Sequence, residues 1–327
     1  MSVRILQGDA LAMLRTLPDK SVQCVVTSPP YFQLRDYGVD GQIGLERTPA
    51  AFLDALYAVF DEVKRVMRDD AVLFVNLGDS YAGSGKGPSG ASGIGDQQQR
   101  QGFVGSKQRT NAGSLTIGSH EYDYRGVKPK SLLLIPERFA IGMADRGWIV
   151  RSQIVWAKKS AMPESVRDRP TSAWETIWMF TKSPRYYWDQ DAVREPLAES
   201  SVARLAQPYN QAASGYRAVN GAPDGDRSHL LERGANIRNV WHLGPEPSRD
   251  AHFASYPTEI PRRCILAATR KGDTVLDPFL GSGTTALVAD RLERNAIGIE
   301  LSPQYAAMAR RRIEGDAPLF ADVEVAS

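Results

Sequence analysis

The stretch Asp277-Pro278-Phe279-Leu280-Gly281-Ser282-Gly283-Thr284-Thr285-Ala286 lies between a short apolar run at 274–276 and a helical pattern at 284–294. Glycines in such a turn let the backbone approach a ligand at the helix N-terminus, where amides are unpaired and the dipole is positive. The stretch therefore predicts a strand, a ligand-binding turn and a helix. With the strand predicted at 296–299 and the helix at 303–313, it forms a compact β-α-β-α module.

The ligand of this turn is open to two interpretations. Gly281, Gly283 and Ala286 satisfy the G-x-G-x-x-G/A dinucleotide fingerprint, and Glu300 ends the next strand, where an acid accepts hydrogen bonds from ribose hydroxyls. A nicotinamide-dependent enzyme is therefore a formal competitor. Asp277, however, would oppose a pyrophosphate but could hold a cationic amino-acid tail. S-adenosylmethionine has a ribose, an ammonium and a sulfonium and no phosphate, so it fits these residues better.

A second motif, Thr27-Ser28-Pro29-Pro30-Tyr31, follows the apolar run at 22–26. The two prolines fix φ and remove two amide donors, so the backbone leaves the strand in an extended turn whose carbonyls stay unpaired. Free carbonyls beside an aromatic ring suit a flat amino group. The alternative, that the turn only terminates a strand, stays open at this point.

The remaining pattern is that of an α/β protein. A strand, helix and strand open the chain, and further strands are predicted between long amphipathic helices. The expected strands are 3–7, 22–26, 71–77, 148–156, 174–181 and 185–188, the last two joined by Ser183-Pro184, and the expected helices before the C-terminal module are 10–17, 49–67, 132–144 and 257–268.

Positive charge is concentrated in two stretches of this chain, although the formal net charge over its 327 residues is only +2. The aperiodic stretch 82–130 carries seven basic and three acidic residues, and so does 151–185. Basic loops of this kind suit phosphate contact, although a solvated insertion is the alternative. The irregular region 195–250 has nearly balanced charge but supplies arginines and asparagines that can read base edges.

The settings of the cysteines and the hydropathy of the sequence predict the cellular compartment. Cys24 and Cys264 each lie in an apolar setting, which predicts buried free thiols in a reducing cytoplasm. No apolar run approaches membrane-spanning length, and no charged segment followed by an apolar one opens the chain. We therefore expect an intracellular, soluble protein located in the cytoplasm.

Together the two motifs resemble the beta class of DNA amino-methyltransferases, which place a (D/N/S)-P-P-(Y/F/W) motif first, then the target-recognition region, then D-P-F-x-G-S-G-T-T. Weaker fragments in the same order support the resemblance over most of the chain. They are Gly8-Asp9-Ala10, Asn76-Leu77-Gly78-Asp79, Val155-Trp156-Ala157-Lys158, Arg169-Pro170, Glu175, Phe180-Thr181-Lys182-Ser183, His252-Phe253-Ala254-Ser255-Tyr256-Pro257 and Gly298-Ile299-Glu300-Leu301-Ser302-Pro303.

The resemblance implies an α/β fold: a doubly wound, mostly parallel seven-stranded sheet with an antiparallel edge hairpin and irregular target-recognition insertions. Its switch point would place the strand ending at Asp277 beside the strand ending at Thr27. The implied organisation is a catalytic part of the core at 1–194 with a flexible basic loop at about 82–130, a target-recognition region at 195–250, and a cofactor-binding part of the same core at 251–327.

The resemblance also implies roles for individual residues. Ser28, Pro29, Pro30 and Tyr31 would form the catalytic turn, in which Ser28 and the Pro29 carbonyl accept the amino hydrogens and Tyr31 stacks on a flipped base. The residues implied for S-adenosylmethionine are Asp9, Phe253, Tyr256, Asp277, Phe279, Gly281, Gly283, Thr284, Thr285 and Glu300. Those expected to contact DNA are Lys158, Lys159, Arg167, Arg169, Arg217, Arg233 and Arg238, and no metal is expected.

The expected activity is methyl transfer from S-adenosylmethionine to the exocyclic N4 of a flipped cytosine in double-stranded DNA. Ser28 favours cytosine because family members that methylate adenine at N6 commonly have Asp there, and adenine N6 is the first alternative. A nicotinamide-dependent oxidoreductase, a methyltransferase acting on protein glutamine or RNA, and an inactive DNA-binding module are the others. Further partners to consider are a cognate restriction endonuclease and a second copy of the chain.

Overall fold

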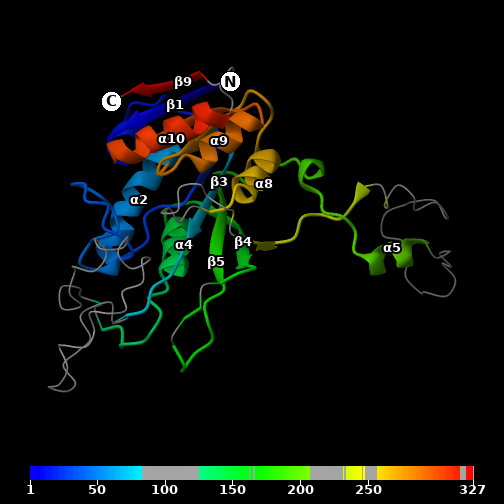
Figure 1. Cartoon of the computed structure of the whole chain (residues 1–327), viewed down its shortest axis with the longest axis horizontal. Coiled ribbons are helices and arrows are strands. Elements are labelled where there is room, and N and C mark those ends of the chain that lie inside the picture. The colour runs from blue at the N-terminus through cyan, green and yellow to red at the C-terminus, as the bar shows by residue number, and fades with distance from the viewer. Residues whose placement is uncertain are drawn as a thin grey trace. The chain divides into compact units, whose positions relative to one another are not determined.

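The computed structural model describes residues 1–82, 124, 126–161, 163–164, 166–206, 231, 233–244, 246, 256–316 and 322–326. Within these residues, nine strands form one sheet in the order β6-β4-β5-β3-β2-β7-β8-β1-β9 (Figure 1). The strands are β1 (Ser2–Gln7), β2 (Val22–Thr27), β3 (Met67–Leu77), β4 (Ile149–Lys158), β5 (Trp174–Thr181), β6 (Val240–Leu243), β7 (Thr274–Asp277), β8 (Asn295–Glu300) and β9 (Asp322–Ala326).

The sheet is mostly parallel, as expected, and only β5 among these strands runs antiparallel to its neighbours, β3 and β4. It has more strands than the seven anticipated, because β6 pairs with β4 at one edge and β9 pairs with β1 at the other. Both additions are short and lie next to irregular sequence, so their periodicity is too brief to recognise.

The strand predicted at 185–188 is wrong: these residues form a bend and irregular chain after β5. Their aromatic rings, which suggested a strand, are held by cations instead. The Tyr186 hydroxyl accepts from Arg151 at 2.9 Å, and the Arg270 guanidinium lies 3.9 Å from the centroid of the Tyr187 ring. Strand β5 therefore pairs with β3 and β4, which both precede it in the chain, and not with a following strand.

Helices form two groups on the sheet (Figure 1). In the first group α2 contacts both α1 and α4, and in the second α9 contacts both α8 and α10. Strand β2 is buried along nearly its whole length and β3 is buried from Ala71 to Leu77, as expected of strands covered on both faces. The helices are α1 (Ala10–Arg15), α2 (Pro49–Val66), α4 (Ile135–Asp145), α8 (Glu259–Ala268), α9 (Thr284–Arg291) and α10 (Pro303–Asp316).

Pairing of β2 with β7 confirms the predicted switch point. Cys24 lies opposite Val275 and Val25 opposite Leu276, although these residues are far apart in sequence. On one side of this pair the sheet continues through β3, and on the other through β8. The carboxyl ends of β2 and β7 therefore lie side by side, and the turns that follow them are neighbours.

The ends of the long insertion after β3 meet. Ala82 N donates to the Ser131 carbonyl and Lys130 N to the Ala82 carbonyl, each at 2.8 Å. The Asp79 carboxylate then accepts from the backbone N–H groups of Leu134 and Ile135 at 3.0 Å, where α4 begins. Most of the predicted flexible loop at 82–130 lies outside the described residues.

The chain divides into two compact units, Met1–Tyr187 with Asn239–Ser327, and Trp188–Arg238. The second unit contains the short helix η2 (Asp191–Val193) and α5 (Glu199–Ala206). The sequence predicts an irregular chain at 195–250, and helix α5 contradicts that prediction. The helix was missed because two turns are too short to show a periodic pattern. Within the unit, Arg194 donates to Asp191 at 2.6 Å and to Asn236 at 2.9 Å.

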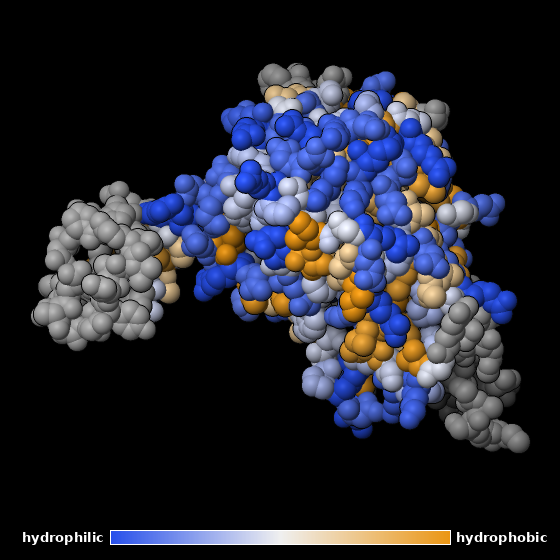
Figure 2. All heavy atoms as spheres, turned by 180° about the vertical axis from the view of Figure 1, so that it is seen from behind, coloured by the Kyte–Doolittle hydropathy of each residue, from blue (hydrophilic) through white to orange (hydrophobic). Residues whose placement is uncertain are grey.

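Hydrophilic residues cover most of the face seen in Figure 2, and hydrophobic residues gather there in separate patches. Among the described residues, no helix is both long and apolar enough to cross a membrane. Both cysteines are buried and unpaired, as the sequence predicted.

Candidate active site

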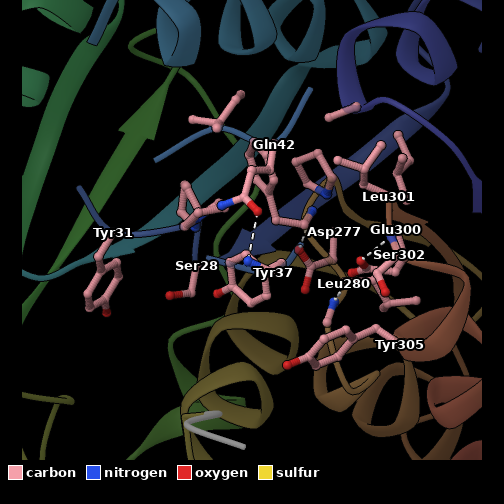
Figure 3. A pocket seen from close by; sticks show the side chains of 18 of the residues that line it. Ser28, Tyr31, Tyr37, Gln42, Asp277, Leu280, Glu300, Leu301, Ser302 and Tyr305 are labelled. Atoms are coloured by element: carbon pink, nitrogen blue, oxygen red, sulfur yellow. Dashed lines mark hydrogen bonds between the residues drawn. The ribbon is translucent and has the colours of Figure 1, made fainter. Parts of the chain in front are cut away.

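A pocket of about 430 Å³ lies at the carboxyl ends of the central strands. Figure 3 shows Ser28 and Tyr31 at one end, Glu300, Ser302 and Tyr305 at the other, and Asp277 between them. The turn after β2 therefore lines the same cavity as the turns after β7 and β8.

The end formed by Ser28 and Tyr31 is where the proline turn leaves β2. Ser28, Pro29, Pro30 and Tyr31, which the sequence predicts as the catalytic turn, all line the pocket. The chain cannot continue the strand because neither proline has an N–H to donate to β3 or β7.

Tyr31 is anchored by residues from two other strands. Its hydroxyl donates to Glu175 Oε2 at 2.6 Å and lies 3.1 Å from Asn76 Oδ1. The ring lies so close to Gly78 that a Cβ built on this glycine would overlap it. Burial, and then the neighbouring Glu175 carboxylate, raise the pKa of Tyr31, while a hydrogen bond with Ser28 acts in the opposite direction. The phenol is therefore a fixed, neutral donor.

Asp277 joins the two motifs. Its Oδ1 accepts from the Thr27 hydroxyl and its Oδ2 from the Thr285 hydroxyl, both at 2.7 Å. The backbone N–H of Phe279 donates to Oδ1 at 3.1 Å, and the Tyr256 hydroxyl lies 3.4 Å from Oδ2. Thr27 immediately precedes Ser28, so this carboxylate fixes the proline turn after β2 against the turn after β7.

Burial raises the pKa of Asp277, although hydrogen bonds from Thr27 and Thr285 oppose the rise. The side chain is 3% exposed and still lines the pocket. An ionised carboxylate here would be stabilised further by a cationic group inside the cavity. The geometry therefore suits an ammonium or sulfonium ligand.

The glycine turn adopts the conformation that its residues predict. Gly281 and Gly283 have φ of 54° and 83°, in the left-handed region that favours glycine. A Cβ on Gly283 would come within 2.9 Å of Ala309 Cβ, so this glycine also lets α9 approach α10. Glu300 holds the turn through Gly281 N, and it also accepts from Ser302 N, both at 2.8 Å.

The remaining predicted cofactor residues are distributed unevenly. Asp9, Tyr256, Phe279 and Thr284 line the pocket, but Gly283 and Thr285 do not. Asp9 also caps α1 through Ala12 N at 2.8 Å. The Thr284 hydroxyl accepts from Arg312 at 2.8 Å, and its preceding residue, Gly283, is the N-cap of α9. Phe253 lies outside the described residues.

The charge of the pocket favours a cationic ligand. Its walls carry the four acidic residues Asp9, Glu175, Asp277 and Glu300 against the two basic residues Arg35 and Lys158. Burial raises the pKa of Glu300, with hydrogen bonds from Ser302 and Gly281 opposing the rise. A pyrophosphate would face these carboxylates with negative charge, whereas S-adenosylmethionine, with an ammonium, a sulfonium and one carboxylate, would bring a net positive charge.

The residues expected to contact DNA fall into different settings. Lys159 and Arg167 are exposed, whereas Lys158 lines the pocket. Arg169 donates to Glu164 at 2.6 Å and stacks over the Tyr81 ring. In the second unit, Arg238 pairs with Glu195 at 2.8 Å and Arg233 with Asp191 at 3.7 Å. Arg217 lies outside the described residues.

Sequence reasoning assigned no role to several residues that line the pocket. Asn76, Trp156 and Glu175 border the end near Tyr31, and Tyr37 and Tyr305 lie edge to face at the other end with their ring centroids 5.8 Å apart. Asn76 and Glu175 stand at ends of strands β3 and β5 that face the same edge of the sheet. A polar residue closing an apolar strand is the signal that could have identified them.

Comparison with known proteins agrees with this geometry. A family model described as DNA methylase, covering N6 and N4 methyltransferases, matches residues 22–311. The chain is 41% identical to the type II methyltransferase M.Cfr9I of Citrobacter freundii, over 95% of this chain and 88% of that protein. It is 36% identical to M.SmaI of Serratia marcescens, over 95% of this chain and 91% of that protein.

Solved structures show the same fold. The structure described as PvuII DNA methyltransferase (cytosine-N4-specific) superposes with a TM-score of 0.62 at 20% identity, covering 95% of this chain and 86% of that one. An M1.HpyAVI–SAM complex superposes with a TM-score of 0.51 at 17% identity, covering 95% and 98%.

The fold and site thus define a doubly wound α/β enzyme whose ligand pocket lies at the switch point of the sheet. The chain belongs to the N6/N4 DNA methylase family. This membership confirms the predicted resemblance, the DNA substrate and S-adenosylmethionine as the cofactor.

Proposed function

We propose that this protein transfers the methyl group of S-adenosylmethionine to the exocyclic N4 of a cytosine flipped out of double-stranded DNA. The observation that carries the proposal is the hydrogen bond between Thr27 and Asp277. It fixes the Ser28 turn against the glycine turn, so one pocket has room for an amino group and for a methyl donor.

The cofactor would occupy the end of the pocket near Glu300. Asp277 would attract the ammonium of its amino-acid tail, Gly281 would let the backbone approach the cofactor, and Glu300 would accept from the ribose hydroxyls. Asp9, Tyr256 and Phe279 would border the other parts of the molecule, because they line the same pocket. When bound, S-adenosylmethionine supplies a methyl group made electrophilic by its sulfonium.

The target base would occupy the end near Tyr31. An exocyclic amine is a poor nucleophile because its lone pair is delocalised into the ring. Ser28 and the Pro29 carbonyl would accept its two hydrogens, which turns the nitrogen towards a tetrahedral shape and aims its lone pair at the cofactor. Tyr31, held by Glu175 and Gly78, would stack on the base.

Cytosine is favoured over adenine by Ser28, and the structural similarity to an enzyme described as cytosine-N4-specific adds support. The second candidate is the same reaction at adenine N6, because a hydroxyl acceptor by itself suits either amine. We extend to this chain the type II classification of its relatives, which would pair it with a restriction endonuclease of the same specificity.

For DNA, we propose that region 195–250 recognises the target sequence and that the exposed Lys159 and Arg167 contact phosphates. Arg233 and Arg238 would contribute from the recognition region. Region 1–194 would supply the catalytic turn and region 251–327 the cofactor turn of one core.

The test is product analysis. The protein is incubated with labelled S-adenosylmethionine and unmethylated duplex DNA, and the DNA is digested to nucleosides and separated. We expect labelled 4-methylcytosine. Labelled 6-methyladenine would move the assignment to the second candidate, and the absence of both products would overturn the proposed function.

A further inference from the structure

A continuous polar chain borders the pocket at the end near Tyr31. The Tyr31 hydroxyl donates to Glu175 Oε2 at 2.6 Å, and Lys158 Nζ donates to Glu175 Oε1. Glu175 stands opposite Trp156 in the pairing of β5 with β4, and Lys158 is the last residue of β4. The lysine is thereby brought into the cavity of Ser28, three strands away in the sheet.

Most donors and acceptors of these linked side chains already have a partner within the protein. Glu175 accepts from Tyr31, Lys158 and Asn76. Asn76 Nδ2 donates both to Glu175 and to the Thr176 carbonyl, and its Oδ1 lies 3.1 Å from the Tyr31 hydroxyl. The Lys158 ammonium has three hydrogens. One of them bonds to Glu175, so two remain for a ligand.

Lys158 is poorly placed for a DNA phosphate. Its side chain is 30% exposed, and its Glu175 partner is 16% exposed. The ammonium also lies 5.0 Å from the centroid of the Trp156 ring, a buried residue of the pocket wall. A phosphate brought here would meet the Glu175 carboxylate, whereas a neutral acceptor would not be repelled.

The two candidate bases differ on the Watson–Crick edge, one position beyond the ring nitrogen that lies next to the amino group. Beyond its N4 amine, cytosine presents two acceptors in succession, N3 and O2. Adenine presents one acceptor, N1, followed by an apolar C2–H. The Lys158 ammonium has two N–H groups left to donate, so the pocket matches the two acceptors of cytosine better than the single acceptor of adenine.

We propose that Lys158 is a specificity-determining residue that donates hydrogen bonds to N3 and O2 of the flipped cytosine, with Glu175 as the positioning residue that holds both Lys158 and Tyr31. This inference rests on the proposed function. It assigns Lys158 to the base rather than to the phosphate backbone, and it explains why a lysine is paired with a carboxylate inside an active-site pocket.

The first experiment compares lysine variants on unmethylated duplex DNA. Lys158→Met keeps the apolar stem and removes the donors. We expect kcat/KM for 4-methylcytosine to fall roughly 10- to 100-fold, the range of a lost bidentate base contact. Affinity for S-adenosylmethionine, measured by calorimetry, and the salt dependence of DNA binding should stay unchanged.

Two comparison variants separate base contact from phosphate contact. Lys159→Met removes the neighbouring exposed lysine and should lower the slope of DNA affinity against salt by about one, the signature of a lost phosphate contact. Lys271→Met, which removes an exposed lysine paired with Glu293 in the turn before β7, should leave transfer unchanged. If Lys158→Met behaves like Lys159→Met, with a lower salt slope and unchanged kcat, the inference is overturned.

The second experiment changes the base instead of the enzyme, which avoids any question of folding. Once the methylated position is mapped, the target cytosine is replaced by 2-thiocytosine, whose sulfur is a weaker acceptor than O2. The substitution should slow the wild-type enzyme more than Lys158→Met, because the variant has no donor to lose. Equal slowing of both proteins would contradict the inference.

These outcomes are distinguishable from failure of the proposed function, which the wild-type product decides alone. If the wild-type enzyme forms 4-methylcytosine and Lys158→Met forms it equally fast, only the inference fails. If the wild-type product is 6-methyladenine, or if neither product forms, the inference fails together with the choice of base or with the reaction.

Discussion

At the scale of single residues, the site is built from side chains that each have several partners remote in sequence. Tyr31 is 144 positions from Glu175, and Asp277 is 250 positions from Thr27. Neither pairing leaves a local signature. The sequence could identify Tyr31 and Asp277 as members of motifs, but it could not show which residues orient them.

Gly78 illustrates how a neighbour controls the catalytic turn. A Cβ at this position would overlap the Tyr31 ring, so Gly78→Ala should displace the ring from the pocket. We expect a fall in single-turnover rate of about tenfold or more, because a misplaced group near the reacting atoms is costly. Cofactor affinity should be retained.

Gly315→Ala is the matched control, because a Cβ at this helical position meets nothing within 4 Å. It should leave the rate unchanged and slightly raise stability, since alanine favours helix over glycine. Equal rates for Gly78→Ala and Gly315→Ala would show that Tyr31 does not depend on this contact.

Asp277 should make stability depend on pH. Burial raises its pKa above the ordinary value of 3.8, so the folded protein binds this proton more tightly than the unfolded one. Its contribution to the free energy of unfolding is therefore largest at low pH and falls as pH rises from 3.8 through the raised pKa.

Asp277→Asn removes that dependence. The stability of the variant relative to the wild type should rise with pH across this window, and urea unfolding at a series of pH values measures it. The variant should also lose affinity for S-adenosylmethionine. If the stabilities of the wild type and Asp277→Asn change with pH in parallel, burial does not raise the pKa of the Asp277 carboxyl.

At the scale of secondary-structure elements, the parts with local signals were predicted well. The turn at 277–286 has its strand, its glycines and its helix within a few residues, and β7 and α9 form there. The predicted adjacency of β2 and β7 is confirmed by their pairing. Strands β6 and β9 and helix α5 were missed because each is short and bounded by irregular sequence.

Aromatic residues led to the prediction of a strand that does not form. The run 185–188 resembles a strand in composition, but Tyr186 and Tyr187 contact Arg151 and Arg270 instead of pairing in the sheet. The position of Lys158 in the pocket could not be predicted from the sequence either, because a basic residue in a basic stretch indicates a surface loop. Only the register of β4 with β5 brings it beside Glu175.

The junction between β2 and β7 gives a prediction at this scale. Thr27→Val keeps the shape of the side chain and removes the hydroxyl that donates to Asp277. Leaving a buried acceptor short of a donor costs about 1–3 kcal/mol of folding free energy. Thr16→Val, whose hydroxyl donates to a carbonyl at an exposed site, is the control and should cost less.

Methyl transfer should fall with Thr27→Val as well, because the catalytic and cofactor turns are no longer tied together. Chemical denaturation and single-turnover assays measure the two effects. If Thr27→Val costs no more than Thr16→Val in both, the junction is not what aligns the site.

At the scale of the whole molecule, near-neutral total charge conceals basic segments suited to DNA. Arg167 is an exposed member of one of them. We expect Arg167→Gln to weaken DNA binding uniformly across sequences and to reduce the salt slope by about 0.9, as for one lost phosphate contact on duplex DNA.

Lys20 serves as the control for that prediction. It precedes β2 at the amino ends of the strands, opposite the pocket, and pairs with Asp69 at 2.7 Å. Lys20→Gln should leave the salt slope unchanged. If both variants change the slope alike, total charge rather than a local phosphate contact governs DNA binding.

In the proposed mechanism, Ser28 acts on the target amine while a separate set of residues holds the cofactor. The most direct measurement is the single-turnover rate of methyl transfer by Ser28→Ala, made beside its affinity for S-adenosylmethionine, with Ser152→Ala on β4 as the control outside the pocket. We predict a large fall in rate with unchanged cofactor affinity for Ser28→Ala alone. An unchanged single-turnover rate would contradict the assignment.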